Sequence, residues 1–286
     1  MKSKFSVLLG ANGGPSLKTR TLETIAQLSM GPSGSYLTRP VGMQDRNRKT
    51  FFFEVLCENH PLPAFKAGQS LPVSFPGEGI LSRPRLLAPV SSPATKDRLV
   101  FCLNDRDDWA LALRTRLEGI AFEGMKALRT RLGRATGSFC LKKGSGPLRH
   151  VFLAEGMGAA PVLSMIESIR DSDRRDGRLL FVWGAEIRDE FFDLETIESI
   201  FRLIAGSRFV PVLSHDPLWR GERGELDAAL LDRVVAESFG MESGSFEWAL
   251  PSWYISAPPE RVRKLRRALL ERGALPQAIH TSSGRS

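Results

Sequence analysis

The sequence predicts a two-domain protein in which an N-terminal antiparallel β-barrel precedes an α/β domain with a doubly wound parallel sheet. Short segments rich in Phe and Val, separated by turns containing Gly and Pro, fill the first half and are typical of a small barrel. Strand-like and helix-like segments alternate in the second half, which indicates βαβ units. A length of 286 residues suits about two domains.

The first half contains three predicted strands and one predicted helix. The strands are Lys49–Cys57, Gln69–Phe75 (interrupted by Pro72) and Arg98–Leu103. Leucines at mixed helical spacing predict a helix from Trp109 to about Leu132. The triplet Phe51-Phe52-Phe53 is expected in the barrel core, and Cys57 and Cys102 are expected there as small apolar residues.

The second half contains four predicted strands and four predicted helices. The strands are His150–Ala154, Leu179–Trp183, Phe209–Leu213 and one within Trp248–Ser256. The helices are Ala160–Arg170, Phe191–Ile204, Leu226–Val235 and Pro259–Arg272. A polar, Gly-rich stretch at 142–147 predicts the boundary between the halves. The predicted division is therefore 1–44 (a partly flexible extension), 45–145 (barrel) and 146–286 (α/β domain).

The composition excludes several classes of protein and leaves the partner open. Lys and Arg number 40 against 32 Asp and Glu, and the net charge of +8 favours anionic partners such as nucleotides or an acidic protein. Three separated cysteines and four scattered histidines offer no clustered soft ligands, so no metal site is expected. No apolar run approaches the roughly 20 residues of a membrane span.

The N-terminal 35 residues are rich in Ser, Thr, Lys and Arg and nearly free of acidic residues. Two interpretations stay open, an organellar transit peptide and a simple N-terminal tail, and the tail is favoured. The odd, sparse cysteine count fits a reducing compartment, so a cytoplasmic location is expected.

The most informative local feature is the turn Gly156-Met157-Gly158-Ala159-Ala160-Pro161, which lies between a predicted strand and a predicted helix. Glycine lets backbone approach a ligand closely, and a helix N-terminus offers free N–H groups to an anion. Proline near a helix start removes no hydrogen bond. The turn predicts a nucleotide-phosphate site, and a tight strand–helix turn without a ligand is the alternative.

Eight short motifs in order resemble those of the ferredoxin–NADP reductase superfamily across residues 45–280. They are Phe65–Gln69 (FKAGQ), Arg83–Pro93 (RPRLLAPVSSP), Gly137-Ser138-Phe139, Gly156–Pro161, Trp183-Gly184-Ala185, Ser214 with Trp219–Gly224 (WRGERG), Tyr254–Pro259 (YISAPP) and Ile279-His280. Members of this family pair an FAD-binding barrel with an NAD(P)-binding domain. The resemblance implies the same domains and cofactors here.

The resemblance also implies two groups of site residues. Those on the flavin side are Arg83, Arg85, Leu87, Ser91, Ser92, Gly137 and Phe139. Those on the nicotinamide side are Gly156, Met157, Gly158, Pro161, Ser214 and Pro258, with Ser256 as the candidate catalytic residue.

The flavin motif departs from the family pattern. With Arg85 as the motif arginine, Leu87 and Ala88 stand where the family has tyrosine and serine, and with Arg83 the replacements are Arg85 and Leu86. The family's Gly-x-x-Ser at a helix start is replaced by Arg106–Trp109 (RDDW), whose acidic pair would repel a diphosphate. Three nearby cations, Arg106, Arg114 and Arg116, are candidates to offset that repulsion. FMN therefore stays open beside FAD, and Trp109 is a candidate for stacking.

The residues at the positions that the family uses for hydride transfer also depart from the family pattern. Ser256-Ala257 replaces a Cys-Gly pair, which predicts slower hydride transfer, and Ser282 replaces an acidic residue. Glu155 places a carboxylate beside the phosphate turn, which disfavours an anion. NADH is favoured over NADPH because His215-Asp216, not an arginine, follows Ser214. Arg220 and Arg223 argue the other way.

The last predicted helix is strongly basic. Its cations are Arg261, Arg263, Lys264, Arg266, Arg267 and Arg272. One interpretation is a docking surface for an acidic electron-transfer protein. A solvated basic face is the favoured alternative. Nucleic acid is not expected, because aromatic residues are not interleaved with the basic ones.

These features together predict a flavin-dependent oxidoreductase that passes hydride from NAD(P)H to a bound flavin and electrons to a separate acceptor, a ferredoxin-like protein or a small molecule. The alternative is a non-catalytic family member that acts as a nucleotide-binding or assembly subunit with a degenerate flavin site.

Overall fold

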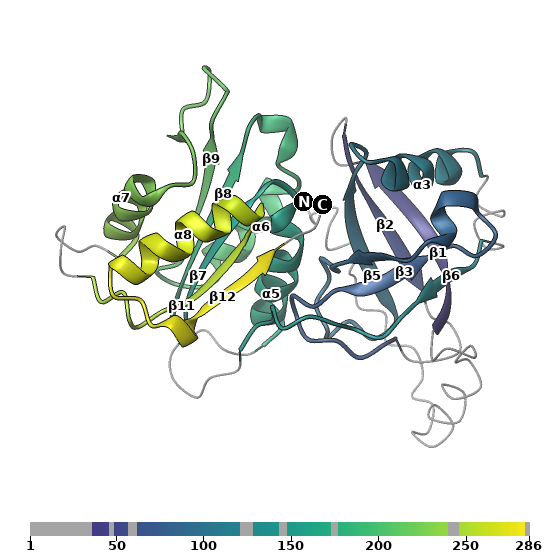
Figure 1. Ribbon diagram of the computed structural model, residues 1–286, viewed down its shortest axis with the longest axis horizontal. Coiled ribbons are helices and arrows are strands. Elements are labelled where there is room, and N and C mark those ends of the chain that lie inside the picture. The colour runs from purple at the N-terminus through teal and green to yellow at the C-terminus, as the bar shows by residue number, and fades with distance from the viewer. Residues whose placement is uncertain are drawn as a thin grey trace. The chain divides into compact units, whose positions relative to one another are not determined.

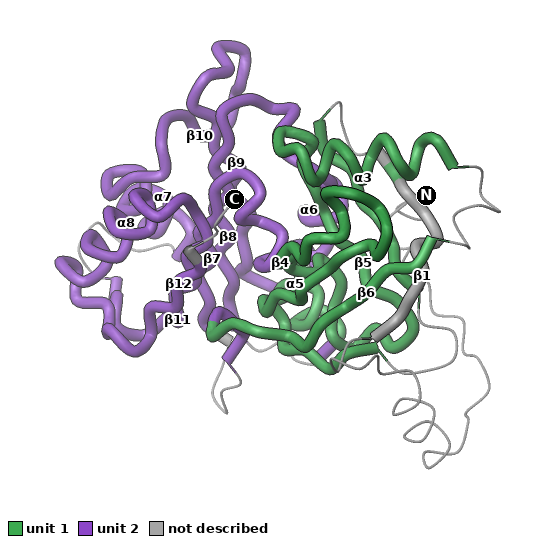
Figure 2. Tube along the Cα trace, turned by 45° about the vertical axis from the view of Figure 1, so that its right-hand side comes forward, with its two compact units in different colours: residues 1–138, 163–171 green, residues 139–162, 172–286 purple. Residues whose placement is uncertain are grey.

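A computed structural model describes residues 36–45, 49–56, 62–120, 128–142, 148–172, 177–239 and 246–283. By their internal contacts these residues form two compact units (Figure 2). Unit 1 contains the chain up to residue 138 together with 163–171, and unit 2 contains 139–162 and everything after 171. The predicted domain boundary and Cys57 lie outside the described residues, so the predicted domain bounds stay a prediction.

Unit 1 is built on a six-stranded antiparallel sheet (Figure 1). Its strands are β1 Tyr36–Asp45, β2 Thr50–Leu56, β3 Leu71–Ser74, β4 Arg85–Leu87, β5 Arg98–Asn104 and β6 Thr130–Leu132. They lie in the order β4-β3-β6-β1-β2-β5. Just after β4, Pro89 forms an antiparallel bridge with Phe101 of β5, and Val90 N–H donates to the Val100 carbonyl over 2.8 Å. These contacts join the two ends of the sheet, and the predicted antiparallel barrel is confirmed.

Aromatic rings fill the interior of this sheet. Phe51, Phe52 and Phe53 are all buried, as expected, and the Phe53 and Phe101 rings stack with centroids 5.1 Å apart. Cys102 is buried as well, as expected for a small apolar residue. Trp109 is also buried and packs against Phe75, with ring centroids 6.0 Å apart. Trp109 is therefore a core residue, and its candidacy for stacking on a ligand is wrong.

The predicted helix from Trp109 to about Leu132 is wrong at its C-terminal end, and residues 121–127 lie outside the described part of the chain. Helix α3 runs from Asp108 to Glu118, and Gly119 follows as its C-cap. Residues 130–132 instead form β6, which pairs with β1 and β3. Thr130 and Leu132 are buried while Arg131 is exposed, so burial here alternates with the period of two that defines a strand.

Unit 2 is built on a six-stranded sheet in which every pairing is parallel. Its strands are β7 Leu148–Glu155, β8 Gly177–Ala185, β9 Arg208–Leu213, β10 Glu222–Arg223, β11 Ser252–Ala257 and β12 Ile279–Ser283. Their order is β10-β9-β8-β7-β11-β12. The helices that follow its strands are α5 Ala159–Asp171, of which residues 163–171 are assigned to unit 1, α6 Leu194–Arg202, α7 Ala228–Phe239 and α8 Pro259–Glu271.

Helices cover both faces of this sheet. Alternate side chains of its strands point to opposite sides, and apolar residues on both sides pack against helices. Leu180 and Val182 of β8 join one apolar cluster with residues of α7 and α8. The intervening Phe181 contacts Phe201 of α6, with ring centroids 6.4 Å apart. The predicted doubly wound α/β domain is confirmed. None of the helices described is long and apolar enough to cross a membrane.

Five strands were not predicted from the sequence. They are β1, β4, β6, β10 and β12. Of these, β1 falls almost wholly within the expected N-terminal extension, and it pairs with both β2 and β6.

The stacked phenylalanines predict the sensitivity of the barrel to mutation. We expect Phe101→Ala to lower the free energy of unfolding by about 3–5 kcal/mol, because it opens a cavity beside Phe53. Leu86→Ala, at an exposed apolar position on β4, should change it by about 0.5 kcal/mol or less. Chemical denaturation of the whole chain measures both, and equal effects would contradict the assigned packing.

Candidate functional site

The candidate site is at the carboxyl ends of β7 and β11, in the middle of the parallel sheet. The two strands pair directly, with Ala154 opposite Ser256. From β7 the sheet extends through β8 to β9 on one side, and from β11 it extends to β12 on the other. The two directions of winding therefore meet between β7 and β11. Open α/β sheets bind ligands beyond the strand ends at this switch point.

The predicted phosphate turn lies directly against the end of β11. A Cβ atom on Gly158 would lie 2.0 Å from the Ser256 carbonyl oxygen, so no other residue fits here without moving backbone. Gly156 has a φ of +53°, and the Trp183 indole donates a 3.0 Å hydrogen bond to its carbonyl. The structure thus brings Gly156, Gly158 and Ser256 together, as the motifs implied.

Two helices begin at this edge of the sheet. After β7, the chain makes a 3₁₀ turn at Gly156–Gly158 and continues into α5. Pro161 lies in the first turn of α5 and is buried, while Met157 is half-buried. After β11, the exposed Pro258 precedes α8, which starts with Pro259. Helix N-termini carry partial positive charge and free N–H groups, so both favour an anion at this edge.

Glu155 is held by Arg261, an arginine of the basic helix α8. The Arg261 Nε lies 3.0 Å from Glu155 Oε2, and its Nη1 lies 2.8 Å from Glu225 Oε2. The hydrogen bond from Arg261 also lowers the pKa of Glu225 and keeps that carboxyl ionised. Arg261 therefore offsets the expected repulsion between Glu155 and an anion at the turn.

Ser256 is buried in β11, between Ala154 of β7 and Ser282 of β12 in the strand register. Ser214 follows β9, which is three strands away from β11 in the sheet, and its hydroxyl lies 2.8 Å from Nδ1 of His215. In the next segment Arg223 donates to the carbonyls of Pro217 and Trp219. The Arg223 side chain is thus used in hydrogen bonds within its own loop. Arg220 is exposed, and it is the arginine of this loop that a phosphate near Ser214 could reach.

On the barrel, the implied flavin residues are mostly engaged with the protein itself. Arg85 pairs with Asp107 over 2.6 Å, and the Arg83 carbonyl accepts a hydrogen bond from Trp109. Leu87 is buried in the barrel core. The Ser91 and Ser92 hydroxyls accept hydrogen bonds from the backbone N–H groups of Val100 and Ala94.

Two barrel motifs meet each other. The Gln69 amide donates to the carbonyl of Gly137 over 3.0 Å, and its oxygen accepts the N–H of Lys66. Gly137 has a φ of +102°, which favours glycine. Phe139, the last residue of that motif, is buried in unit 2 and contacts Tyr254 edge-on at 6.2 Å.

Most of the basic helix α8 is neutralised within the chain. Arg261, Lys264, Arg267 and Arg272 pair with acidic residues, the last of them with Asp232. Arg263 and Arg266 remain exposed. These pairs weaken the case for α8 as a docking surface and favour the solvated face.

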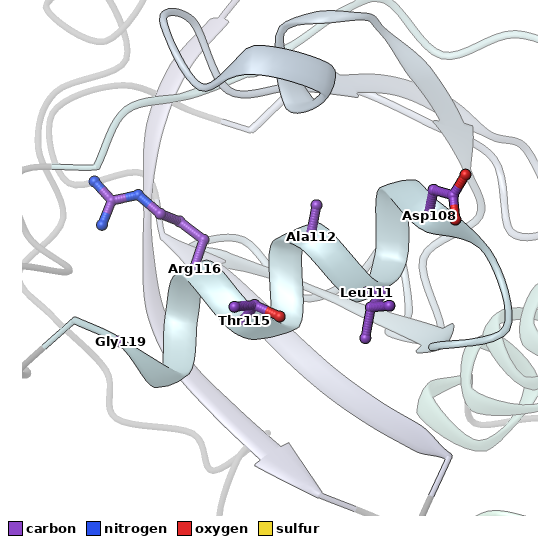
Figure 3. A pocket seen from close by; sticks show the side chains of 6 residues that line it. All are labelled: Asp108, Leu111, Ala112, Thr115, Arg116 and Gly119. Atoms are coloured by element: carbon purple, nitrogen blue, oxygen red, sulfur yellow. The ribbon is translucent and has the colours of Figure 1, made fainter.

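A shallow hollow of about 480 Å³ lies on α3, lined by Asp108, Leu111, Ala112, Thr115, Arg116 and Gly119 (Figure 3). None of the implied site residues lines it. In the part of the chain that the structure describes, no group of three His, Cys, Asp or Glu residues could hold a metal ion.

Two side chains that shape these sites were missed from the sequence, namely Asp107 as the partner of Arg85 and Arg261 as the partner of Glu155. An acidic residue just before a helix is a recognisable N-cap signal, which could have identified the role of Asp107 at α3. Arg261 is 106 residues from Glu155, and no local pattern connects them.

Comparison with known proteins agrees with this geometry. Residues 152–245 match the family model of the oxidoreductase NAD-binding domain. No curated protein matches the sequence. Among solved structures, the cytochrome P450 reductase GcoB of Amycolatopsis is 21% identical with a TM-score of 0.66, over 88% of this chain and 72% of that one. The chain has the ferredoxin–NADP reductase fold.

Two further reductases share this fold. The ferredoxin–NADP⁺ reductase of Neisseria gonorrhoeae, solved with bound FAD and NADP, is 19% identical with a TM-score of 0.66, over 87% of this chain and 98% of that one. The cytochrome b5 reductase domain of Ulva prolifera nitrate reductase is 11% identical with a TM-score of 0.67, over 89% and 99%. The resemblance inferred from the motifs to the ferredoxin–NADP reductase superfamily is therefore confirmed at the level of the fold.

The close approach at Gly158 predicts a stability effect that is independent of any ligand. We expect Gly158→Ala to lower the free energy of unfolding by about 1–3 kcal/mol, because the new methyl group overlaps the Ser256 carbonyl. Gly184→Ala is the matched control on β8, where a Cβ would meet its nearest neighbour at an ordinary 3.7 Å. Thermal denaturation compares the two, and a Gly184 effect as large as that of Gly158 would contradict the assignment.

Proposed function

We propose that this chain binds a nicotinamide dinucleotide at the carboxyl edge of its parallel sheet and acts as an oxidoreductase of the ferredoxin–NADP reductase type. The observation that carries the proposal is the contact between Gly158 and the Ser256 backbone at the switch point, where α5 and α8 both begin. The match of residues 152–245 to an oxidoreductase NAD-binding domain supports it.

In this proposal the N–H groups of the Gly156–Gly158 turn receive the diphosphate, and the dipole of α5 stabilises its charge. Arg261 holds the Glu155 carboxylate and so keeps its charge compensated beside the turn. Ser256, small and buried at the end of β11, is the residue we place next to the nicotinamide ring. Ser214, at the end of β9, is proposed to bind the adenosine ribose, and Pro258 to border the same edge.

NADH is the proposed form of the dinucleotide. Asp216, two residues after Ser214, accepts the N–H of Leu218, so an acidic side chain is fixed in this loop. Arg223 is used to hold the loop together. Arg220 is the cation that opposes this preference.

The resemblance further implies a flavin on the barrel that takes hydride from the dinucleotide and passes electrons to a separate acceptor, either a ferredoxin-like protein or a small molecule. With Arg85 as the motif arginine, the barrel residues do not fit FAD held by its diphosphate. Arg85 is engaged with Asp107, and the Ser91 and Ser92 hydroxyls bind backbone. No step of the reaction is therefore assigned to FAD.

The engagement of Arg85 with Asp107 favours a second candidate function. In it the chain binds the dinucleotide without turnover and serves as a nucleotide-binding or assembly subunit. The two candidates share the sheet site and differ in whether electrons leave the bound NADH.

Calorimetric titration and a spectrum separate these functions. We expect the purified chain to bind NADH more tightly than NADPH, because of Asp216 and the engaged Arg223. Oxidation of NADH, followed by loss of its absorbance with ferricyanide or FMN as acceptor, supports the oxidoreductase. Binding without oxidation supports the second candidate, and an absence of NADH binding contradicts both.

The role of Arg261 predicts a change in affinity. We expect Arg261→Gln to weaken NADH binding by about tenfold, because Glu155 then faces the diphosphate with its charge uncompensated. Arg263→Gln, which removes the same charge from an exposed position on the same helix, should have a much smaller effect. Titrations at two salt concentrations test this, and equal losses in the two variants would show that only the net charge matters.

A further inference from the structure

Two side-chain contacts join the start of α3 to Arg83, just before β4, and to Arg85, the first residue of β4. The Trp109 indole donates to the carbonyl of Arg83 over 3.2 Å, and Arg85 Nη1 lies 2.6 Å from Asp107 Oδ1. Trp109 is buried in the core of the same unit. The position of Asp107 against Arg85 is therefore set by the packing of the helix as well as by the ion pair.

The Asp107 carboxylate has a second bond. Its Oδ1 also accepts the backbone N–H of Ala110 over 2.9 Å, so Asp107 is the N-cap of α3. A guanidinium and the N-terminus of a helix are the two groups with which proteins most readily hold a phosphate. Here one carboxylate of the chain itself occupies both.

An incoming diphosphate would meet this carboxylate directly. The side chains of Arg85 and Asp107 are 28% and 37% exposed, so a ligand can reach the pair. To bind Arg85, a phosphate must displace Asp107, which leaves α3 without its cap and a carboxylate next to another anion. Asp108 adds a further negative charge in the first turn of the helix.

We infer that Asp107 is a built-in counter-anion that fills the phosphate position of the barrel and makes the barrel select against flavins that carry a diphosphate. The wild-type chain then binds FAD no more tightly than riboflavin, which has the same ring system without phosphate. Removal of the Asp107 charge opens the position. This inference concerns unit 1 alone and does not depend on the dinucleotide site proposed for unit 2.

The decisive variant is Asp107→Asn, because asparagine caps a helix as well as aspartate does and lacks the charge. Equilibrium dialysis of the whole chain against FAD and, separately, riboflavin measures both affinities. We expect Asp107→Asn to raise the affinity for FAD by about tenfold, the equivalent of one hydrogen bond to a charged group, and to leave riboflavin unchanged. Asp107→Ser, a second good cap, should give the same selective gain.

Two controls isolate the mechanism. Asp108→Asn removes the same charge one residue further on, where the side chain lines the hollow on α3 (Figure 3), and it should change the ratio of FAD to riboflavin affinity by much less. Adding Arg85→Gln to Asp107→Asn should abolish the gain, because the freed guanidinium is what binds the phosphate. Thermal denaturation of each variant verifies that it is folded.

Three outcomes would overturn the inference. In the first, the wild-type chain binds FAD much more tightly than riboflavin. In the second, Asp107→Asn and Asp107→Ser fold but show no selective gain in affinity for FAD. In the third, Asp108→Asn gains as much affinity for FAD as Asp107→Asn does. NADH binding, measured on the same samples, reports separately on the function proposed for unit 2.

Discussion

The close approach of Gly158 to the end of β11 is the constraint on which the candidate site depends. With backbone of the turn this near the Ser256 carbonyl, the first residues of α5 must start at the seam between β7 and β11. The Trp183 indole holds the turn from β8, on the other side of β7. Geometry alone requires glycine at position 158, because any Cβ atom would overlap the Ser256 carbonyl. The motif therefore has a structural cause as well as the functional one that we propose.

Much of the fold was predictable because burial follows local periods. The parallel strands are nearly continuous apolar runs, and the helices between them carry apolar residues at helical spacing. The prediction failed where a period was too short to recognise, as at Thr130–Leu132, which has three residues and was absorbed into a preceding helical pattern. Strand β10 has two residues and owes its existence to pairing with β9.

The candidate site was predictable in part for a related reason. Gly156, Gly158 and Pro161 belong to one local motif whose chemistry can be read from neighbouring residues. The ionic partners could not be read in this way, because Arg85 and Asp107 are 22 residues apart, and Glu155 and Arg261 are 106 apart. From composition alone Arg261 belonged to a basic helix face, whereas the structure pairs it with Glu155, beside the Gly156–Gly158 turn. Charge counted along a sequence does not distinguish a free cation from a neutralised one.

Two helix starts in this chain use the same groups in opposite ways. At each, a carboxylate stands close to the helix or turn that follows a strand, and an arginine lies within reach of it. At the turn before α5, Glu155 makes no side-chain cap bond, because its carboxylate is held by Arg261 from α8. At α3, Asp107 caps the helix and draws Arg85 onto itself, so one internal anion satisfies both positive groups. Whether a helix N-terminus can accept an external phosphate is therefore decided by where the nearest carboxylate is bound. In the functions that we propose for the two units, the fold persists in both while only unit 2 keeps its anion position open.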